Sequence, residues 1–147
     1  MREIRTILLA EDNPKDVELT LEALSDYNLA NEVVVVKDGE AALDYLHRRG
    51  AYANRPPENP ALILLDIKMP KVDGLEVLKE IKSHDSLRVI PVVILSSSRE
   101  ERDLLASYGM GVNAYVVKPV KFHDFIEAVK ALGLFWAFFN EPPRPAA

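Results

Sequence analysis

The 147-residue sequence contains no cysteine. This absence excludes disulfide bonds, thiolate catalysis and zinc sites built from cysteine. The sequence also has no apolar run near the roughly 20 residues that a bilayer-spanning helix needs, and it opens with no charged-then-apolar leader. We therefore expect a cytoplasmic protein that does not associate with a membrane.

Positive charge is in deficit, with 18 lysines and arginines against 23 acidic residues and a net charge of −5. This balance argues against a nucleic-acid-binding surface. Histidine is scarce as well, and His47, His84 and His123 show no ligand-like spacing. We therefore assign the histidines no chemistry on sequence grounds.

The residues that are present predict one soluble α/β domain. Apolar residues make up 48% of the chain, and short apolar runs alternate with one-sided helical patterns. This alternation is typical of a parallel sheet covered by helices on both faces, a doubly wound fold. The predicted strands are Ile7–Ala10, Val33–Val36, Leu62–Leu65, Pro91–Leu95 and Ala114–Val117.

Two segments between the strands have distinct local signals. Asn13 is a suitable N-cap and Pro14 a suitable first helical residue, so a helix is expected to begin directly after Glu11 and Asp12. The segment from His47 to Pro60 is rich in proline and asparagine and predicts an extended surface loop.

Charged residues follow three of the predicted strands, at Glu11 and Asp12, at Asp66 and at Lys118. Residues that follow the strands of a doubly wound sheet meet at its carboxyl edge. We therefore expect these side chains to converge. Because clustered carboxylates repel one another unless a cation lies among them, and because all their ligand atoms are oxygen, the cluster suits Mg²⁺.

A carboxylate beside Mg²⁺ and an ammonium group can attack phosphorus. Asp66 is the expected nucleophile because it stands alone at the end of a strand, and Asp12 is the better metal ligand. Taken singly, these residues have plainer explanations. Asp12 could simply cap a helix, and Lys118 could be a solvated lysine at the end of a strand. The joint occurrence of the charged residues at the strand ends is what favours phosphoryl chemistry.

Four segments, ILLAEDNP, LILLDIKMPKVDG, VVILSSS and AYVVKP, occur in this order. Together they resemble the receiver domain of two-component response regulators, from about Arg5 to about Leu132. The resemblance implies a flavodoxin-like (βα)5 fold with an extended C-terminal helix. It also divides the chain into a receiver domain, 1–132, and an aromatic, proline-rich extension, 133–147.

The resemblance further implies the roles of individual residues. Asp66 would accept a phosphoryl group from a phosphohistidine of a sensor histidine kinase. Magnesium would be bound by Asp12, Asp66 and the backbone carbonyl of Lys68, with Glu11 acting mainly through metal-bound water. Such a protein is a signalling switch that is itself modified, and not an enzyme in the usual sense.

The same resemblance assigns residues to the response that follows phosphorylation. Ser96 would hydrogen-bond a phosphoryl oxygen and Lys118 would pair with the phosphoryl group. Tyr115 would be the aromatic residue that turns inward as Ser96 moves, although a tyrosine in a strand is more often a packing residue. A cis peptide bond before Pro119 is also implied.

Finer features resemble the small stand-alone response regulators that work with phytochrome-type histidine kinases. These are the proline-bearing insertion, the serine run after the fourth strand, the absence of an output domain and the aromatic pair beyond the last helix. The aromatic residues there exceed what one side of a terminal helix buries, and contiguous exposed apolar patches often mark interfaces. We expect a homodimer through Phe135, Trp136, Phe138 and Phe139.

Two alternative functions remain open at this point. A flavodoxin-like electron carrier has the same alternation of strands and helices, but Glu11 and Asp12 would repel a phosphate group in the absence of a metal. A metal-dependent phosphatase shares the aspartate nucleophile. It usually has a second carboxylate two residues later, where this chain has Lys68.

Overall fold

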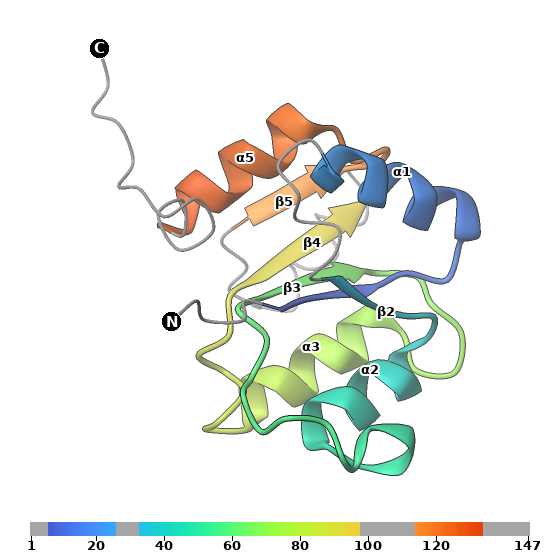
Figure 1. Ribbon diagram of the computed structural model, residues 1–147, viewed down its shortest axis with the longest axis vertical. Helices are drawn as coiled ribbons and strands as arrows, with labels where there is room; N and C mark the ends of the chain where they lie inside the picture. The colour runs from blue at the N-terminus through green and yellow to red at the C-terminus, as the bar shows by residue number, and fades with distance from the viewer. Residues whose placement is uncertain (1–5, 26–32, 98–113, 134–147) are drawn as a thin grey trace.

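The computed structural model describes residues 6–25, 33–97 and 114–133. In these ranges five strands form one parallel sheet in the order β2-β1-β3-β4-β5 (Figure 1). Three strands have the predicted bounds. Strand β3 extends one residue further than predicted, to Asp66, and β4 begins and ends one residue later than predicted, at Val92 and Ser96. The strands are β1 (Ile7–Ala10), β2 (Val33–Val36), β3 (Leu62–Asp66), β4 (Val92–Ser96) and β5 (Ala114–Val117).

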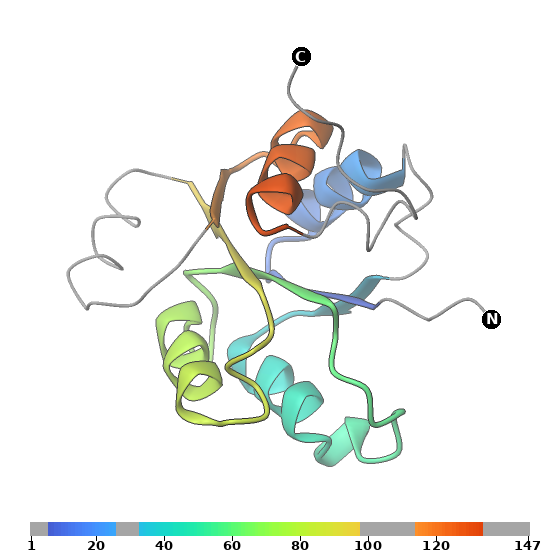
Figure 2. The same cartoon turned by 90° about the vertical axis from the view of Figure 1, so that its left-hand side faces the viewer.

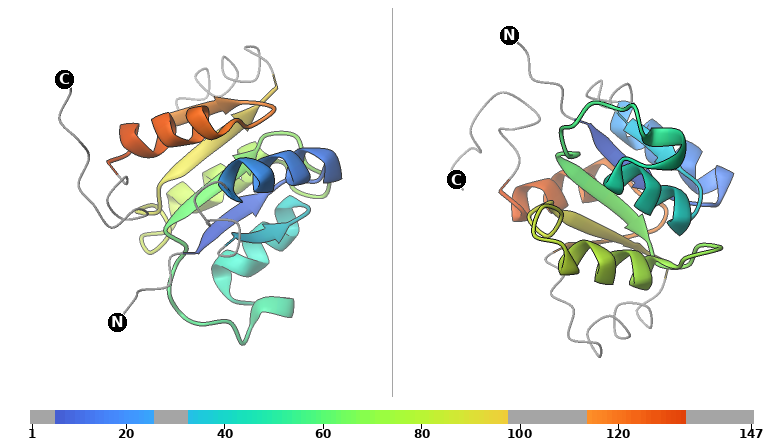
Figure 3. Two further views of the ribbon diagram at one scale, coloured as in Figure 1. Left: turned by 45° about the horizontal axis from the view of Figure 1, so that its top comes forward. Right: turned by 90° about the horizontal axis from the view of Figure 1, so that it is seen from below.

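The helices cover both faces of the sheet, which confirms the predicted doubly wound architecture. Helices α1 and α5 pack together over one face, whereas α2 and α3 pack together over the other (Figures 2 and 3). The described helices are α1 (Pro14–Ser25), α2 (Gly39–His47), the 3-10 helix η2 (Gly50–Tyr52), α3 (Gly74–Ser83) and α5 (Phe122–Ala131).

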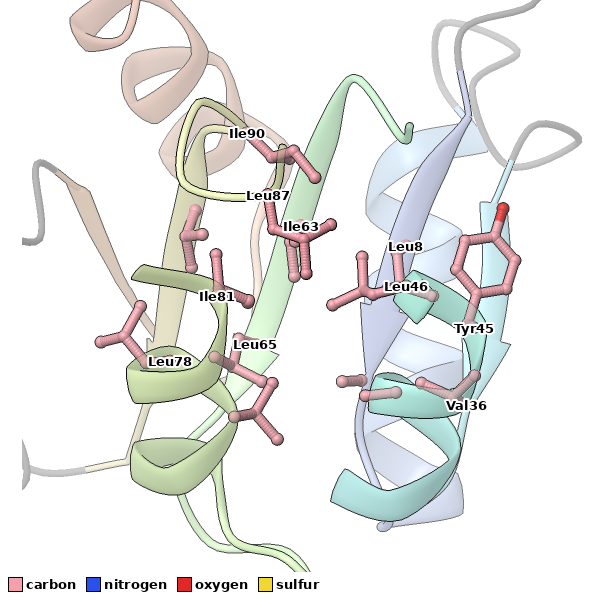
Figure 4. Packing of buried hydrophobic residues seen from close by; sticks show 14 of the residues in the cluster. Leu8, Val36, Tyr45, Leu46, Ile63, Leu65, Leu78, Ile81, Leu87 and Ile90 are labelled. Atoms are coloured by element: carbon pink, nitrogen blue, oxygen red, sulfur yellow. The ribbon is translucent and has the colours of Figure 1, made fainter. Parts of the chain in front are cut away.

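Each face of the sheet has its own apolar core, because side chains alternate between the faces along every strand. Beneath α2 and α3, the core includes Leu8, Ile63, Leu78 and Ile81 (Figure 4). The core beneath α1 and α5 includes the fully buried Phe125. Strands β1, β3 and β4 are buried throughout, so their short apolar runs are explained by burial on both faces.

Side-chain caps fix where three helices begin. The Asn13 side chain accepts hydrogen bonds from the backbone N–H groups of Lys15 and Asp16, at 2.9 and 3.2 Å. Asp38 and Asp73 cap α2 and α3 in the same way. The predicted start of α1 at Pro14 is therefore confirmed, and its cap places the first turn of α1 next to Glu11.

The segment between His47 and Pro60 differs from the extended loop that the sequence predicts. It contains η2, and the Arg55 guanidinium donates hydrogen bonds to the backbone carbonyls of Tyr45 and Glu58, at 2.6 and 3.0 Å. The same guanidinium lies 4.3 Å from the centre of the Tyr45 ring. Because one arginine satisfies several carbonyls, the segment folds back compactly against the end of α2.

The C-terminal predictions extend past what the structure describes. Helix α5 ends at Ala131, and Gly133 takes a left-handed conformation with φ of 72°. The expected helix extension and the aromatic residues Phe135, Trp136, Phe138 and Phe139 lie outside the described residues. Across the described ranges, each helix is too short or too polar to cross a membrane.

Candidate functional site

Three carboxylates meet at the carboxyl edge of the sheet. Glu11 directly follows β1 and Asp66 ends β3; these strands are hydrogen-bonded neighbours. One oxygen from each of Glu11, Asp12 and Asp66 lies within 4.8 Å of the others. Glu11 is fully buried and Asp66 is 3% exposed, whereas Asp12 is exposed. The predicted convergence is therefore observed.

Lys118 joins these carboxylates from β5. Its ammonium nitrogen lies 2.7 Å from Glu11 Oε1 and 3.1 Å from Asp66 Oδ2. The backbone N–H of Lys118 donates to the Ser96 carbonyl at 2.9 Å, which ties the ends of β5 and β4 together. The Lys118–Pro119 peptide bond is cis, as predicted.

Burial and neighbouring charges determine the electrostatics of the cluster. Burial raises the pKa of Glu11 to about 7, with Lys118 opposing the rise and Asp66 adding to it. Burial alone would lower the pKa of Lys118, but the carboxylates of Glu11 and Asp66 raise it above the ordinary lysine value. The lysine therefore remains positively charged. The cluster holds strongly interacting charges that are largely buried.

The acidic cluster fits a divalent cation. Its Glu11 Oε1 atom is buried, and Lys118 is the positive charge that it contacts, at 2.7 Å. All three candidate ligand groups are carboxylates, which favour hard cations such as Mg²⁺ and Mn²⁺. An exposed carboxylate at Asp12 beside two buried ones also leaves the site open to solvent on one side.

Asp16 is a member of the site that sequence reasoning missed. Its Oδ2 atom lies 3.3 Å from the Lys118 ammonium nitrogen. Asp16 stands in the first turn of α1, one helical turn after Asp12, so the predicted start of this helix was the signal that could have identified it.

The other predicted site residues lie in β4 and β5 or shortly after β3. Ser96 is buried at the end of β4, and Tyr115 is partly buried in β5, opposite Ile94. Lys68 follows β3 with an exposed side chain. Beyond Asp66, Asp73 caps α3 and the Gly74 N–H donates to the Ile67 carbonyl at 2.7 Å.

A parallel flavodoxin-like sheet with an acidic cluster, an opposing lysine and a buried serine at its carboxyl edge defines a class of proteins, the phosphoacceptor receivers. The family described as response regulator receiver domain matches residues 7–130. The chain belongs to this family.

Individual relatives agree with this assignment. Response regulator Rcp1 of Synechocystis sp. is 42% identical over 132 residues, which cover 90% of this chain and 88% of that protein. The bacteriophytochrome response regulator AtBRR is 62% identical, with a TM-score of 0.88 over 95% of this chain and 100% of that one. A structure of the Mn(2+)-bound form of Rcp1 is 40% identical, with a TM-score of 0.72 over 95% and 99% of the two chains.

Family membership establishes the general activity. The chain is a response regulator receiver, its family function is to accept a phosphoryl group, and receivers of this family pair with sensor histidine kinases. Neither of the alternatives, an electron carrier or a phosphatase, is supported by these matches.

Proposed function

We propose that Asp66 accepts a phosphoryl group from a phosphohistidine of a sensor histidine kinase and that the reaction requires Mg²⁺. The observation that carries this proposal is the position of the Lys118 ammonium group, 2.7 Å from Glu11 and 3.1 Å from Asp66 at the edge where β1 and β3 end. This arrangement brings a nucleophile, a fixed positive charge and cation ligands together.

The transfer is a displacement at phosphorus. A carboxylate oxygen of Asp66 forms the new O–P bond, the N–P bond of the phosphohistidine breaks, and the imidazole leaves with the electron pair. Lys118 stabilises negative charge on the transferring phosphoryl oxygens, since its ammonium group already lies beside Asp66 Oδ2. Backbone bonding to Ser96 holds this lysine in place.

Asp12, Asp66 and the backbone carbonyl of Lys68 would hold the cation, with Glu11 acting through water. The cation would neutralise phosphoryl charge and orient the transferring group. Support comes from the all-oxygen cluster, in which one carboxylate oxygen from each of Glu11, Asp12 and Asp66 lies within 4.8 Å of the others.

Ser96 and Tyr115 form the proposed switch. Ser96 is buried where β4 reaches the site, and Tyr115 lines a groove of about 430 Å³ between β5 and α5. Phosphorylation acts only as far as it favours one of two existing arrangements. A hydroxyl drawn toward a phosphoryl oxygen would free space for the Tyr115 ring to turn inward.

We further propose a phytochrome-type kinase as the partner and a stand-alone mode of action. The support is the similarity to a bacteriophytochrome response regulator over nearly all of both chains. The division into a receiver domain, 1–132, and an extension, 133–147, stays a prediction. The cytoplasmic location stays a prediction as well.

Intact-mass measurement after incubation with acetyl phosphate and Mg²⁺ tests the phosphorylation site. The parent chain should gain the mass of one phosphoryl group, and Asp66→Asn should gain none because an amide is not a nucleophile here. Asp85→Asn is a matched control, since the Asp85 side chain is 92% exposed and pairs with Arg88 on the surface; it should be modified like the parent.

Equal modification of Asp66→Asn and the parent would contradict the proposal. Repeated turnover of small phosphate esters would instead favour the phosphatase alternative, and a yellow, flavin-containing preparation would favour the electron carrier. If no adduct forms when Mg²⁺ is chelated before acetyl phosphate is added, the requirement for the cation is supported.

We also propose a homodimer formed through Phe135, Trp136, Phe138 and Phe139. The support is the sequence pattern alone. The full chain should sediment as a dimer, and the chain truncated after Gly133 should sediment as a monomer. As a control, Val89→Ser in the full chain removes an apolar side chain from a residue that is 73% exposed, and it should remain dimeric. A dimeric truncated chain would exclude the extension as the interface.

A further inference from the structure

A second cluster of metal-ligating side chains lies between the ends of α2 and α3. His47 is the last residue of α2, Glu80 belongs to α3, and His84 directly follows α3. One ligand atom from each of these three residues lies within 4.8 Å of the others. The sequence alone indicates no chemistry for the histidines, because nothing in the local spacing shows that His47 and His84 meet.

This His47–Glu80–His84 cluster is separate from the phosphoryl site. Helices of a doubly wound sheet run opposite to its strands, so the C-terminal ends of α2 and α3 lie toward the amino edge of the sheet. The acidic cluster lies at the carboxyl edge, where β1 and β3 end. Figure 4 shows that Ile81 lies closer than Leu78 to Ile90 along α3. Glu80 is the residue next to Ile81 in the sequence.

Both imidazole rings approach the same carboxylate oxygen. His84 Nε2 lies 2.8 Å from Glu80 Oε1 and makes a hydrogen bond, as residues one helical turn apart often do. His47 Nε2 lies 3.3 Å from the same oxygen. The two rings meet edge to face, with centroids 4.8 Å apart and an angle of 69° between their planes.

A pair of ordinary hydrogen bonds does not account for His47. Its Nε2 atom is buried and lies 3.3 Å from Glu80 Oε1, but it makes no well-formed hydrogen bond with the described residues. Buried polar nitrogens in folded proteins are normally satisfied. A metal ion between the three side chains would satisfy this nitrogen, His84 Nε2 and the Glu80 oxygen together.

The ligand set indicates which cations the cluster suits. Two imidazole nitrogens and one carboxylate oxygen are a set that Zn²⁺ takes with a fourth position open, and imidazole also suits Ni²⁺ and Cu²⁺. Mg²⁺ and Ca²⁺ prefer oxygen ligands and would favour the acidic cluster instead. The two sites therefore differ in the cations that they select.

The distances fit such an ion after a small adjustment. With metal–ligand bonds of about 2.1 Å, the ligand atoms of a tetrahedral site are about 3.4 Å apart. The distance between His47 and Glu80 is already 3.3 Å, and the distance between His84 and Glu80 would need to open from 2.8 Å. The side chains of Glu80 and His84 are 40% and 46% exposed, which leaves them free to adjust.

We propose that His47, Glu80 and His84 form a binding site for a transition-metal dication of the zinc type, which clamps the C-terminal end of α2 to that of α3. Three protein ligands leave the fourth position of the ion open to water. The proposal rests on this cluster alone and does not depend on which residue is phosphorylated.

Calorimetric titration of the untagged full chain with Zn²⁺, in excess Mg²⁺, tests the site. The excess Mg²⁺ would fill the acidic cluster, which suits hard cations, and leave the histidines free for Zn²⁺. One Zn²⁺ should bind to the parent chain and raise its thermal midpoint. Because even the partners of metal ligands contribute about 10–100-fold to affinity, His84→Ala should weaken Zn²⁺ binding by about 100-fold or more.

The matched control is His123→Ala, which removes the third and last histidine of the chain from an exposed position on α5. It should bind Zn²⁺ like the parent. His47→Gln is a second variant that should also lose binding, and circular dichroism without metal shows whether each variant folds. Zn²⁺ binding that survives in both folded variants, or that is lost in Asp66→Asn instead, would overturn the proposal.

Discussion

Replacement of Lys118 with alanine is expected to slow phosphoryl uptake from acetyl phosphate by about 100- to 1,000-fold, the usual cost of removing one fixed group that stabilises developing charge. The same change should strengthen Mg²⁺ binding. In the structure the ammonium group lies 2.7 Å from Glu11 and 3.1 Å from Asp66, so it competes with a cation for these carboxylates.

We expect Mg²⁺ to bind roughly tenfold more tightly. This gain is a modest share of the interaction energy of about 4 kcal/mol between two unit charges 4 Å apart near a protein surface. Without metal, the free energy of unfolding should fall by about 3 kcal/mol, because a buried charge cluster loses its only close cation among the described residues. Proton uptake by Glu11, whose pKa is about 7, limits this loss.

Three measurements check these effects: an intact-mass time course, calorimetric Mg²⁺ titration and denaturant unfolding in chelator. Lys130→Ala is the control, because Lys130 is 48% exposed and its ion pair with Glu127 spans 3.9 Å. Exposed pairs of this kind contribute about 0–1 kcal/mol. Weaker Mg²⁺ binding by Lys118→Ala would show that the lysine does not compete with the cation.

The parts of the site that were predictable from the sequence depend on local patterns. Short apolar runs that stop at Glu11 and Asp66 mark the ends of buried strands, and parallel pairing carries both ends to one edge. The start of α1 was predictable for the same reason, since Asn13 and Pro14 act on the backbone next to them.

The parts that were not predictable depend on contacts between elements. Asp16 reaches Lys118 only because β5 ends beside the first turn of α1. His47 and His84 meet only because α2 and α3 pack with their C-terminal ends together. Arg55 folds its loop through carbonyls of α2 that a loop-like composition does not reveal. A single sequence places Asp16 at the start of α1 but contains no local signal for these contacts between elements.

Gly74→Ala is expected to lower the free energy of unfolding by about 3 kcal/mol, at the upper end of the usual cost of overpacking. Gly74 begins α3 where the chain returns past β3. A β-carbon there would overlap the Asp66 carbonyl oxygen and lie 2.7 Å from the Ile67 α-carbon. Both contacts are with backbone, so no side-chain rotation relieves them.

The same substitution should also impair phosphorylation, which separates it from a change in stability alone. Relief of the overlap requires α3 or the end of β3 to move, and the end of β3 carries Asp66. Because a displacement of about 1 Å can cost about 100-fold in rate, the folded variant should take up phosphate more slowly by about this factor. Denaturant unfolding and the intact-mass time course measure the two effects on one preparation.

Gly133→Ala provides the matched comparison, because the two glycines are needed for different reasons. A β-carbon at Gly133 meets no atom within 4 Å, but the residue has φ of 72°, a conformation that costs other residues about 1–2 kcal/mol. Gly133→Ala should therefore destabilise the chain less than Gly74→Ala and leave the phosphorylation rate unchanged. If the two variants lose the same stability and both keep the parent rate, close packing of α3 on the Asp66 backbone does not position the nucleophile.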